Sequence, residues 1–214
     1  SSGATLAPLL ADIAWERGDI GQVNSLLNLR LGMIDDFCPP DGLSLCYVVL
    51  ARQAQLNAQP DEALALLRHA GQLCMQRGWW RARIALIAEE ITLHLDTGNK
   101  DHALRQFALL QQLASEPGAV ENEVVGWHRG ICESRLLLAE GDALTAAKRL
   151  TSLINEQERC GEWLAATRSR IEQAVAFWRA GEEKQAIAAC VPALPQAVAQ
   201  KMQRTLLNGG PALL

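Results

Sequence analysis

The residue types most often used for redox, metal or nucleophilic chemistry are present, but they are not spaced for it. The six cysteines have no pair closer than eight residues: Cys38, Cys46, Cys74, Cys132, Cys160 and Cys190. A zinc site or a dithiol redox centre usually has two cysteines separated by about two intervening residues. We therefore expect reduced cysteines with a structural role.

The histidines and carboxylates give a similar result. No two of the four histidines lie four residues apart around a glutamate: His69, His94, His102 and His128. A glycine-rich phosphate loop and a nucleophile elbow are also absent from the sequence. Glu89 and Glu90, with His94 about one helical turn later, could form a metal site, but an ordinary helical ion pair is favoured. The sequence predicts no enzyme, no metal site and no cofactor.

Composition limits the remaining classes. The chain has 214 residues, of which 49% are hydrophobic and 21% are charged, as in an ordinary globular domain. No apolar run approaches the roughly 18 residues of a membrane helix, and the first residues lack the layout of a signal peptide. The net charge of −4 argues against direct nucleic-acid binding, which needs clustered Lys and Arg. We expect a cytoplasmic protein that binds neither membranes nor nucleic acids.

Five turn signals divide the chain into helical hairpins of nearly constant length. They are centred on residues 18, 58, 98, 141 and 181, so their spacings are 40, 40, 43 and 40 residues. Repeats of this length are typical of arrays of helix pairs. Alternating β-branched segments are scarce, so no sheet is expected. The predicted fold is all-α, a right-handed superhelix of about five hairpins similar to tetratricopeptide (TPR) repeats.

Side-chain size supports this register. Five residues after each turn centre stands a small or β-branched residue, namely Val23, Ala63, Ala103, Ala146 or Ala186. Small side chains allow the two helices of a hairpin to approach closely. Nine residues after the turn, larger apolar residues recur at Leu27, Leu67, Phe107 and Leu150, where they are expected to fill the layer between hairpins.

Proline and glycine mark the boundaries of the pairs. We expect one domain over 1–214, with pairs at about 4–38, 41–77, 79–116, 119–160 and 162–199 and a tail over 200–214. Pro39 and Pro40 separate the first two pairs, and Pro117 and Gly118 separate the third from the fourth. Because Pro192 removes a backbone donor, the last second helix is expected to break near Val191.

Two segments carry a resemblance to a known family. The stretch from Leu136 to Leu150 resembles the repeats of MalT-like regulators, and Arg204 to Leu213 resembles the segment after their later repeats, with Asn208-Gly209 in place of an acidic pair. Such regulators are ATP-dependent LuxR-type activators with a P-loop module before the repeats and a helix-turn-helix after them. The resemblance implies an excised sensor fragment, which starts at Ser1-Ser2-Gly3 and binds an inducer or partner protein to control assembly of the activator.

The resemblance to TPR arrays also implies a concave groove lined by the first helix of each pair. Counting back from the turns selects seven candidate ligand-binding residues: His128, Arg135, Arg168, Trp178, Arg179, Arg52 and Gln55. Arginine forks suit carboxylate or phosphate, and an indole face suits a sugar ring or a flat apolar group. The alternative is structural, with arginines solvated or paired to a neighbouring glutamate and Trp178 completing the core.

Other surfaces are candidates for contacts with partners. Adjacent Trp79 and Trp80 face different directions on a helix, so we expect one in the core and one as an exposed contact. The leucines near the C-terminal end are Leu206, Leu207, Leu213 and Leu214, and they predict open apolar surface and self-association. A competing hypothesis for the whole chain is a free-standing adaptor that binds a peptide or partner protein in its groove.

Overall fold

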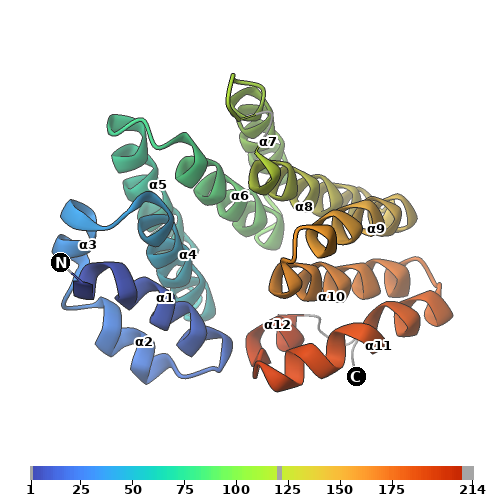
Figure 1. Cartoon of the computed structure of the whole chain (residues 1–214). Coiled ribbons are helices and arrows are strands. Elements are labelled where there is room, and N and C mark those ends of the chain that lie inside the picture. The colour runs from blue at the N-terminus through green and yellow to red at the C-terminus, as the bar shows by residue number, and fades with distance from the viewer. Residues whose placement is uncertain (1, 120–121, 209–214) are drawn as a thin grey trace. The chain divides into compact units, whose positions relative to one another are not determined.

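The computed structural model describes residues 2–119 and 122–208, and within them it contains helices and no strand (Figure 1). The helices are α1 (Ser2–Glu16), α2 (Ile20–Leu27), α3 (Leu31–Phe37), α4 (Pro40–Leu56), α5 (Pro60–Gln76), α6 (Trp80–Asp96), α7 (Lys100–Ala114), α8 (Glu123–Glu140), α9 (Ala143–Arg159), α10 (Trp163–Arg179), α11 (Glu183–Ala199) and α12 (Gln203–Asn208). The all-α prediction is confirmed. No helix of this described part is both long and apolar enough to cross a membrane.

Tight turns join the helices of each pair. We call α1, α4, α6, α8 and α10 the first helices, and α2, α5, α7, α9 and α11 the second helices. The central residue of each turn has a positive φ: Gly18, Ala58, Gly98, Gly141 and Gly181. Four of these five turn residues are glycine, which adopts this conformation without a steric penalty. Ala58 adopts it at φ 58° with a Cβ in place, so this turn carries local strain.

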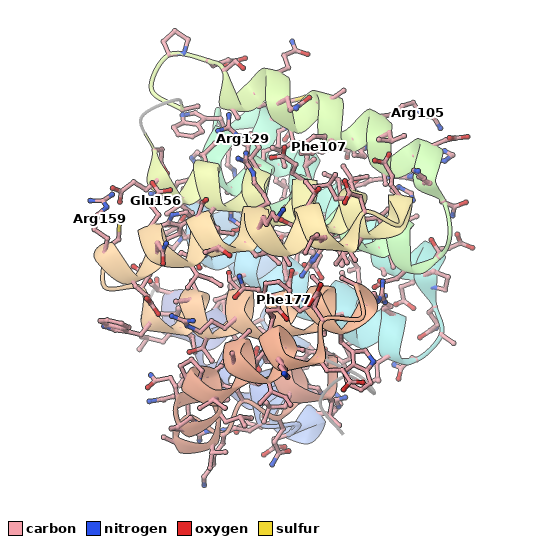
Figure 2. All side chains as sticks on the ribbon, turned by 90° about the vertical axis from the view of Figure 1, so that its right-hand side faces the viewer. Arg105, Phe107, Arg129, Glu156, Arg159 and Phe177 are labelled. Atoms are coloured by element: carbon pink, nitrogen blue, oxygen red, sulfur yellow. The ribbon has the colours of Figure 1, made fainter. Side chains whose placement is uncertain are left out.

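The small residues lie where the sequence predicts close helix crossings. Val23, Ala63, Ala103 and Ala146 are fully buried, and Ala186 is nearly so. The prediction that larger apolar residues fill the layer between hairpins holds at three of its four positions, since Leu27, Leu67 and Leu150 are also fully buried. Phe107 is the exception, because it is half-buried on α7 while Leu110, one turn later, is fully buried instead (Figure 2).

Helix α11 corrects the expected break near Val191. It runs from Glu183 to Ala199 with Pro192 and Pro195 inside it. Both prolines lie on exposed positions of the helix. The carbonyl groups that lose their donors can therefore bond to water, which makes an interior proline less costly than in a buried helix.

The first pair also differs from the expected hairpin, because its second half is not one continuous helix. It is divided into α2 and α3 by residues 28–30. The Arg30 guanidinium Nη1 donates to the carbonyl oxygens of Ser25 and Leu26, at 2.7 and 2.9 Å. These bonds satisfy acceptors that the end of α2 leaves open.

The chain divides into two compact units, the first ending at Arg129 and the second beginning at Gly130, so the boundary falls within α8. In the first unit the core includes fully buried Leu43, Val49 and Leu67 from α4 and α5. In the second unit Ala146 and Ala147 of α9 pack against Ala176 of α10, with Phe177 beside them (Figure 2). Each unit thus has its own apolar core.

Candidate interaction surface on the first helices

An arginine–glutamate pair joins successive first helices in each unit. In the first unit, Arg52 of α4 donates from Nε and Nη2 to Glu89 of α6, at 2.7 and 2.8 Å. In the second unit, Arg135 of α8 donates from Nε to Glu172 of α10 at 3.3 Å and from Nη2 to the other carboxylate oxygen. The four side chains are between 11% and 31% exposed, so both pairs are partly shielded from water.

The two pairs occupy one register of the repeat. Each arginine stands six residues before its own turn residue, and each glutamate stands nine residues before the next one. The separation is 37 residues in both cases. This spacing is visible in the sequence, and it could have identified Glu89 and Glu172 as partners. Two of the predicted ligand-binding arginines, Arg52 and Arg135, are therefore held in ion pairs with a neighbouring helix.

A second polar contact follows the same face in the first unit. The Gln55 side-chain amide donates to Asp96 Oδ2 at 2.7 Å, again from α4 to α6. The residues concerned stand three and two positions before their turn residues. We call the positions nine, six, three and two residues before each turn residue the first-helix face. In the second unit, these four positions on α10 carry Glu172, Val175, Trp178 and Arg179.

The predicted groove residues are divided between the units. Arg52, Gln55 and His128 belong to the first unit, while Arg135, Arg168, Trp178 and Arg179 belong to the second. Trp178 is 46% exposed and Arg179 is also exposed, whereas His128 and Arg168 are half-buried. The second unit therefore presents an indole and a guanidinium to solvent on the face that carries the Arg135–Glu172 pair.

The adjacent tryptophans do not divide into one core and one exposed residue, because Trp79 and Trp80 are both half-buried. Both line an open hollow of about 240 Å³ at the start of α6, together with Arg81 and Asn122. The Arg77 guanidinium lies 4.8 Å from the centre of the Trp79 ring. Arg81 forms an ion pair with Asp41. Each indole thus keeps one part packed and another part open to the hollow.

The two carboxylates near His94, those of Glu89 and Glu90, have different surroundings. Glu89 binds Arg52, while Glu90 is 6% exposed and burial raises the pKa of its carboxyl group. Burial lowers the pKa of His94, and the neighbouring His102, with ring centres 5.2 Å apart, lowers it further. Among the residues with described positions, no three His, Cys, Asp or Glu side chains gather to hold a metal ion. These polar side chains of α6 thus contact neighbouring helices, α4 through Glu89 and α7 through His94.

One polar network was not expected from the sequence. The Tyr47 hydroxyl donates to Asp35 Oδ1 at 2.7 Å, and His69 Nε2 lies 2.9 Å from the other oxygen of the same carboxylate. The three residues come from α3, α4 and α5, so the network ties the short helix α3 to the second pair. No regular spacing connects them in the sequence, and the contact depends on the break between α2 and α3.

Comparison with known families gives one match. A search of curated proteins and a search of solved structures found no similar protein. The family model described as the MalT-like TPR region matches residues 3–214. Helical repeats of this kind are generally non-catalytic modules that mediate protein–protein interaction, and the helical hairpins described above agree with that architecture. The chain belongs to the family of MalT-like TPR regions.

Proposed function

We propose that this chain is the inducer-sensing and interaction module of a bacterial ATP-dependent LuxR-type activator, and that the first-helix face of the second unit binds the inducer. The membership of the MalT-like family supports the regulator context. The observation that carries the binding site is the exposed pair Trp178 and Arg179 on the same face as Arg135 and Glu172. Self-association and contacts with a partner protein belong to the same proposal.

The chemistry of this face suits a small anionic or sugar-like molecule. Arg135 already binds a carboxylate, that of Glu172, through two of its nitrogen atoms. A ligand carboxylate or phosphate can replace Glu172 in that geometry, because two oxygen atoms of either group can accept the two parallel N–H bonds of the guanidinium fork. The exposed indole of Trp178 offers a flat surface for a sugar ring or an apolar ring. Arg179 adds a second positive charge beside it.

Exchange of Glu172 for a ligand gives binding a structural consequence. The Arg135–Glu172 pair connects α8 to α10, so a ligand that takes the guanidinium releases a contact between successive first helices. A ligand can shift a conformational equilibrium only through such differential contacts. Ligand binding would therefore change the packing of α8 against α10, and this change is the response of the sensor.

A thermal-shift screen against sugars, aromatic acids and nucleotides tests the binding proposal. A ligand at about 100 times its dissociation constant adds roughly 2.7 kcal/mol to the free energy of unfolding. In a domain of this size that corresponds to a rise of about 5–10 °C in Tm. Each hit is then measured by calorimetry with the variants Arg135→Ala and Trp178→Ala. Loss of one charge-assisted hydrogen bond weakens binding by about ten- to a hundredfold.

Arg52→Ala provides the matched control. Arg52 holds the same register position and the same kind of ion pair in the first unit, so its loss has a similar effect on stability. Binding that survives Arg52→Ala and is lost with Arg135→Ala and Trp178→Ala supports the proposed site. Ligand binding that is unchanged in all three variants refutes it. Tight binding of extended peptides, with no small-molecule hit, instead favours an adaptor.

A further inference from the structure

The hollow of about 240 Å³ at the start of α6 lies outside the proposed ligand site. It is lined by Pro40, the first residue of α4, by residues 78–82 and by Asn122. All of these residues belong to the first unit, whereas the proposed ligand site belongs to the second. Apart from Asn122, they lie in the continuous described stretch 2–119. We call this feature the tryptophan hollow.

The size and the lining of the tryptophan hollow suit a single apolar side chain. Sites for small molecules usually have volumes of about 300–1,000 Å³, so this hollow is small for most of them. Its walls include the half-buried indoles of Trp79 and Trp80 and the half-buried ring of Pro40. Tryptophan and arginine are enriched among the residues that contribute most to protein–protein binding. One anchoring side chain of a partner protein therefore fits this hollow.

Positive charge surrounds the tryptophan hollow in a chain whose net charge is −4. Residues 77–88 include three arginines and no acidic residue. The guanidinium of Arg77 lies 4.8 Å from the centre of the Trp79 ring, and among the described residues its Nη1 has no hydrogen-bond partner. A positive charge beside an apolar surface attracts a carboxylate from solution. The charge of the site thus favours an acidic partner.

The ion pair between Arg81 and Asp41 can exchange its carboxylate. Arg81 lines the hollow and pairs with Asp41 of α4. The two side chains are 43% and 66% exposed, and exposed pairs contribute little because water competes with them. A carboxylate of a docked partner can therefore replace Asp41 on the guanidinium. In the free protein, Asp41 acts as a competitor of that carboxylate.

The arginine at this place belongs to α6 and is not part of the repeat pattern. Arg81 stands 17 residues before the turn residue of its hairpin. The same position on the first helices α4, α8 and α10 carries other residue types, namely Asp41, Val124 and Leu164. The start of a first helix therefore packs in this array without an arginine.

Helix α10 provides an internal comparison for the indole. Trp163 holds on α10 the register position that Trp80 holds on α6, and it is 57% exposed. On α10, Leu164 and Ala166 stand in place of Arg81 and Arg83. The same chain thus contains an exposed indole without the arginines of the hollow. This comparison separates the effect of apolar contact from the effect of charge.

We propose that the tryptophan hollow docks an acidic segment of a partner protein through one apolar side chain flanked by carboxylates. The apolar side chain packs on the indoles of Trp79 and Trp80. The flanking carboxylates pair with the guanidinium groups of Arg81 and Arg77. This inference rests on the contact with a partner protein in the proposed function, and it gives that contact a site and a charge.

Titration with short acidic peptides tests the docking. The probes are acetylated and amidated pentapeptides, Glu-Asp-X-Asp-Glu, in which X is leucine, proline or phenylalanine. NMR follows the indole N–H signals of the six tryptophans, and Trp79→Phe, Trp80→Phe and Trp163→Phe each remove and thereby assign one signal. With at least one probe, the signals of Trp79 and Trp80 should move and that of Trp163 should not. Peptide concentrations up to about 2 mM detect a contact with a millimolar Kd.

Variants of the charged residues should change the affinity in opposite directions. Arg81→Gln and Arg77→Gln should each weaken peptide binding about two- to fivefold, as expected for an exposed charge contact. Asp41→Asn should strengthen it by a similar factor, because it removes the competing carboxylate. A purely structural role of the Arg81–Asp41 pair predicts weaker binding in both partners' variants. Trp80→Ala should weaken binding at least tenfold, because it removes an anchoring indole.

Matched peptides provide the controls. A probe with serine at X lacks the apolar anchor, and a probe with four lysines in place of the acidic residues reverses the charge, so neither should move the two signals. Circular dichroism checks folding, and Trp80→Leu replaces Trp80→Ala if that variant unfolds. The inference is overturned if no acidic probe moves the signals of Trp79 and Trp80, or if the lysine probe binds as tightly. An equal response of Trp163 also overturns it.

The chain itself contains one alternative occupant. Val120 and Glu121, which precede Asn122 in the sequence, also combine an apolar and an acidic side chain. The variant Val120→Ser with Glu121→Gln tests whether these residues compete with the probe. Probe binding that appears only in this variant assigns the hollow to the chain's own residues and overturns docking of a partner. Equal binding by the variant and the unmodified chain supports it.

Failure of this inference can be distinguished from failure of the ligand proposal. The hits of the thermal-shift screen are measured again with Trp80→Ala, which keeps Arg135 and Trp178. A small-molecule response that persists there, without peptide binding to the unmodified chain, refutes only the docking site. Peptide binding at the hollow without any small-molecule hit supports docking and removes inducer sensing. A probe that moves the Trp178 signal alone binds the first-helix face instead and refutes docking at the hollow.

Discussion

The ion pair between Arg52 and Glu89 gives a prediction whose size follows from its burial. The Glu89 side chain is 11% exposed and the Arg52 side chain 31%. Removing one partner of a fully buried pair costs about 3–5 kcal/mol, whereas an exposed pair contributes about 0.2–1 kcal/mol. For this partly shielded pair, Arg52→Met should lower the free energy of unfolding by about 2 kcal/mol, because the carboxylate stays largely dehydrated without its partner. Methionine keeps much of the apolar contact of the arginine stem.

A double-mutant cycle with Arg52→Met and Glu89→Gln measures the coupling by urea unfolding. The pair Arg81–Asp41 provides the comparison, since its side chains are 43% and 66% exposed. Its cycle should give a coupling well below about 1 kcal/mol. The change Arg52→Met should also lower Tm by about 4–8 °C. A coupling between Arg52 and Glu89 no larger than that of the exposed pair would refute the argument from burial.

Three further changes test the turns, the buried acid and the helix crossings. Ala58→Gly should raise the free energy of unfolding by about 1 kcal/mol, because glycine adopts a left-handed backbone without strain. Gly98→Ala should lower it by a similar amount, and equal Tm values for these two variants would contradict the argument from backbone strain. Burial raises the pKa of Glu90 above its usual 4.5, so the folded chain holds that proton more tightly and loses stability as pH rises through the folded pKa. Glu90→Gln should therefore be neutral below about pH 4, become stabilising as the pH rises through the folded pKa and stay at that level above it, and a pH-independent difference in urea unfolding would exclude this cause. Ala146→Leu should overpack a fully buried crossing and cost about 1–3 kcal/mol, and an unchanged Tm would show that the crossing is not close.

The fold could be predicted from the sequence where the same residue type recurs at the same position of successive hairpins. Gly18, Gly98, Gly141 and Gly181 mark turns that need a positive φ, so their spacing gave the hairpins directly. Ala58 fits only by register, since its type alone would not predict a left-handed backbone. Burial of the residues five positions after each turn, four alanines and Val23, follows the same logic, because close helix crossings favour small side chains.

Features that depend on the surroundings of a residue were less predictable. Pro192 breaks a helix in a buried setting, but its exposed position lets water satisfy the freed carbonyl group. The residue type of Arg52 and Arg135 does not distinguish an ion pair from a ligand contact. The repeated 37-residue spacing to Glu89 and Glu172 was the available signal, and the structure shows that these glutamates bind the two arginines from the next first helix. For Trp79, a half-buried position depends on the hollow at the start of α6.

The repeated 37-residue ion pair also bears on how such an array can grow by gene duplication. The pairs link α4 to α6 and α8 to α10, whereas the same register positions on α6 and α8 carry Thr92 and Cys132, which cannot form an ion pair. Copying a single hairpin would separate an arginine from its glutamate or add a charge without its counterpart. Copying two consecutive hairpins, α4–α7 or α8–α11, would carry a complete pair with it. A doublet of hairpins is therefore the smallest segment whose duplication would carry a complete ion pair of this kind.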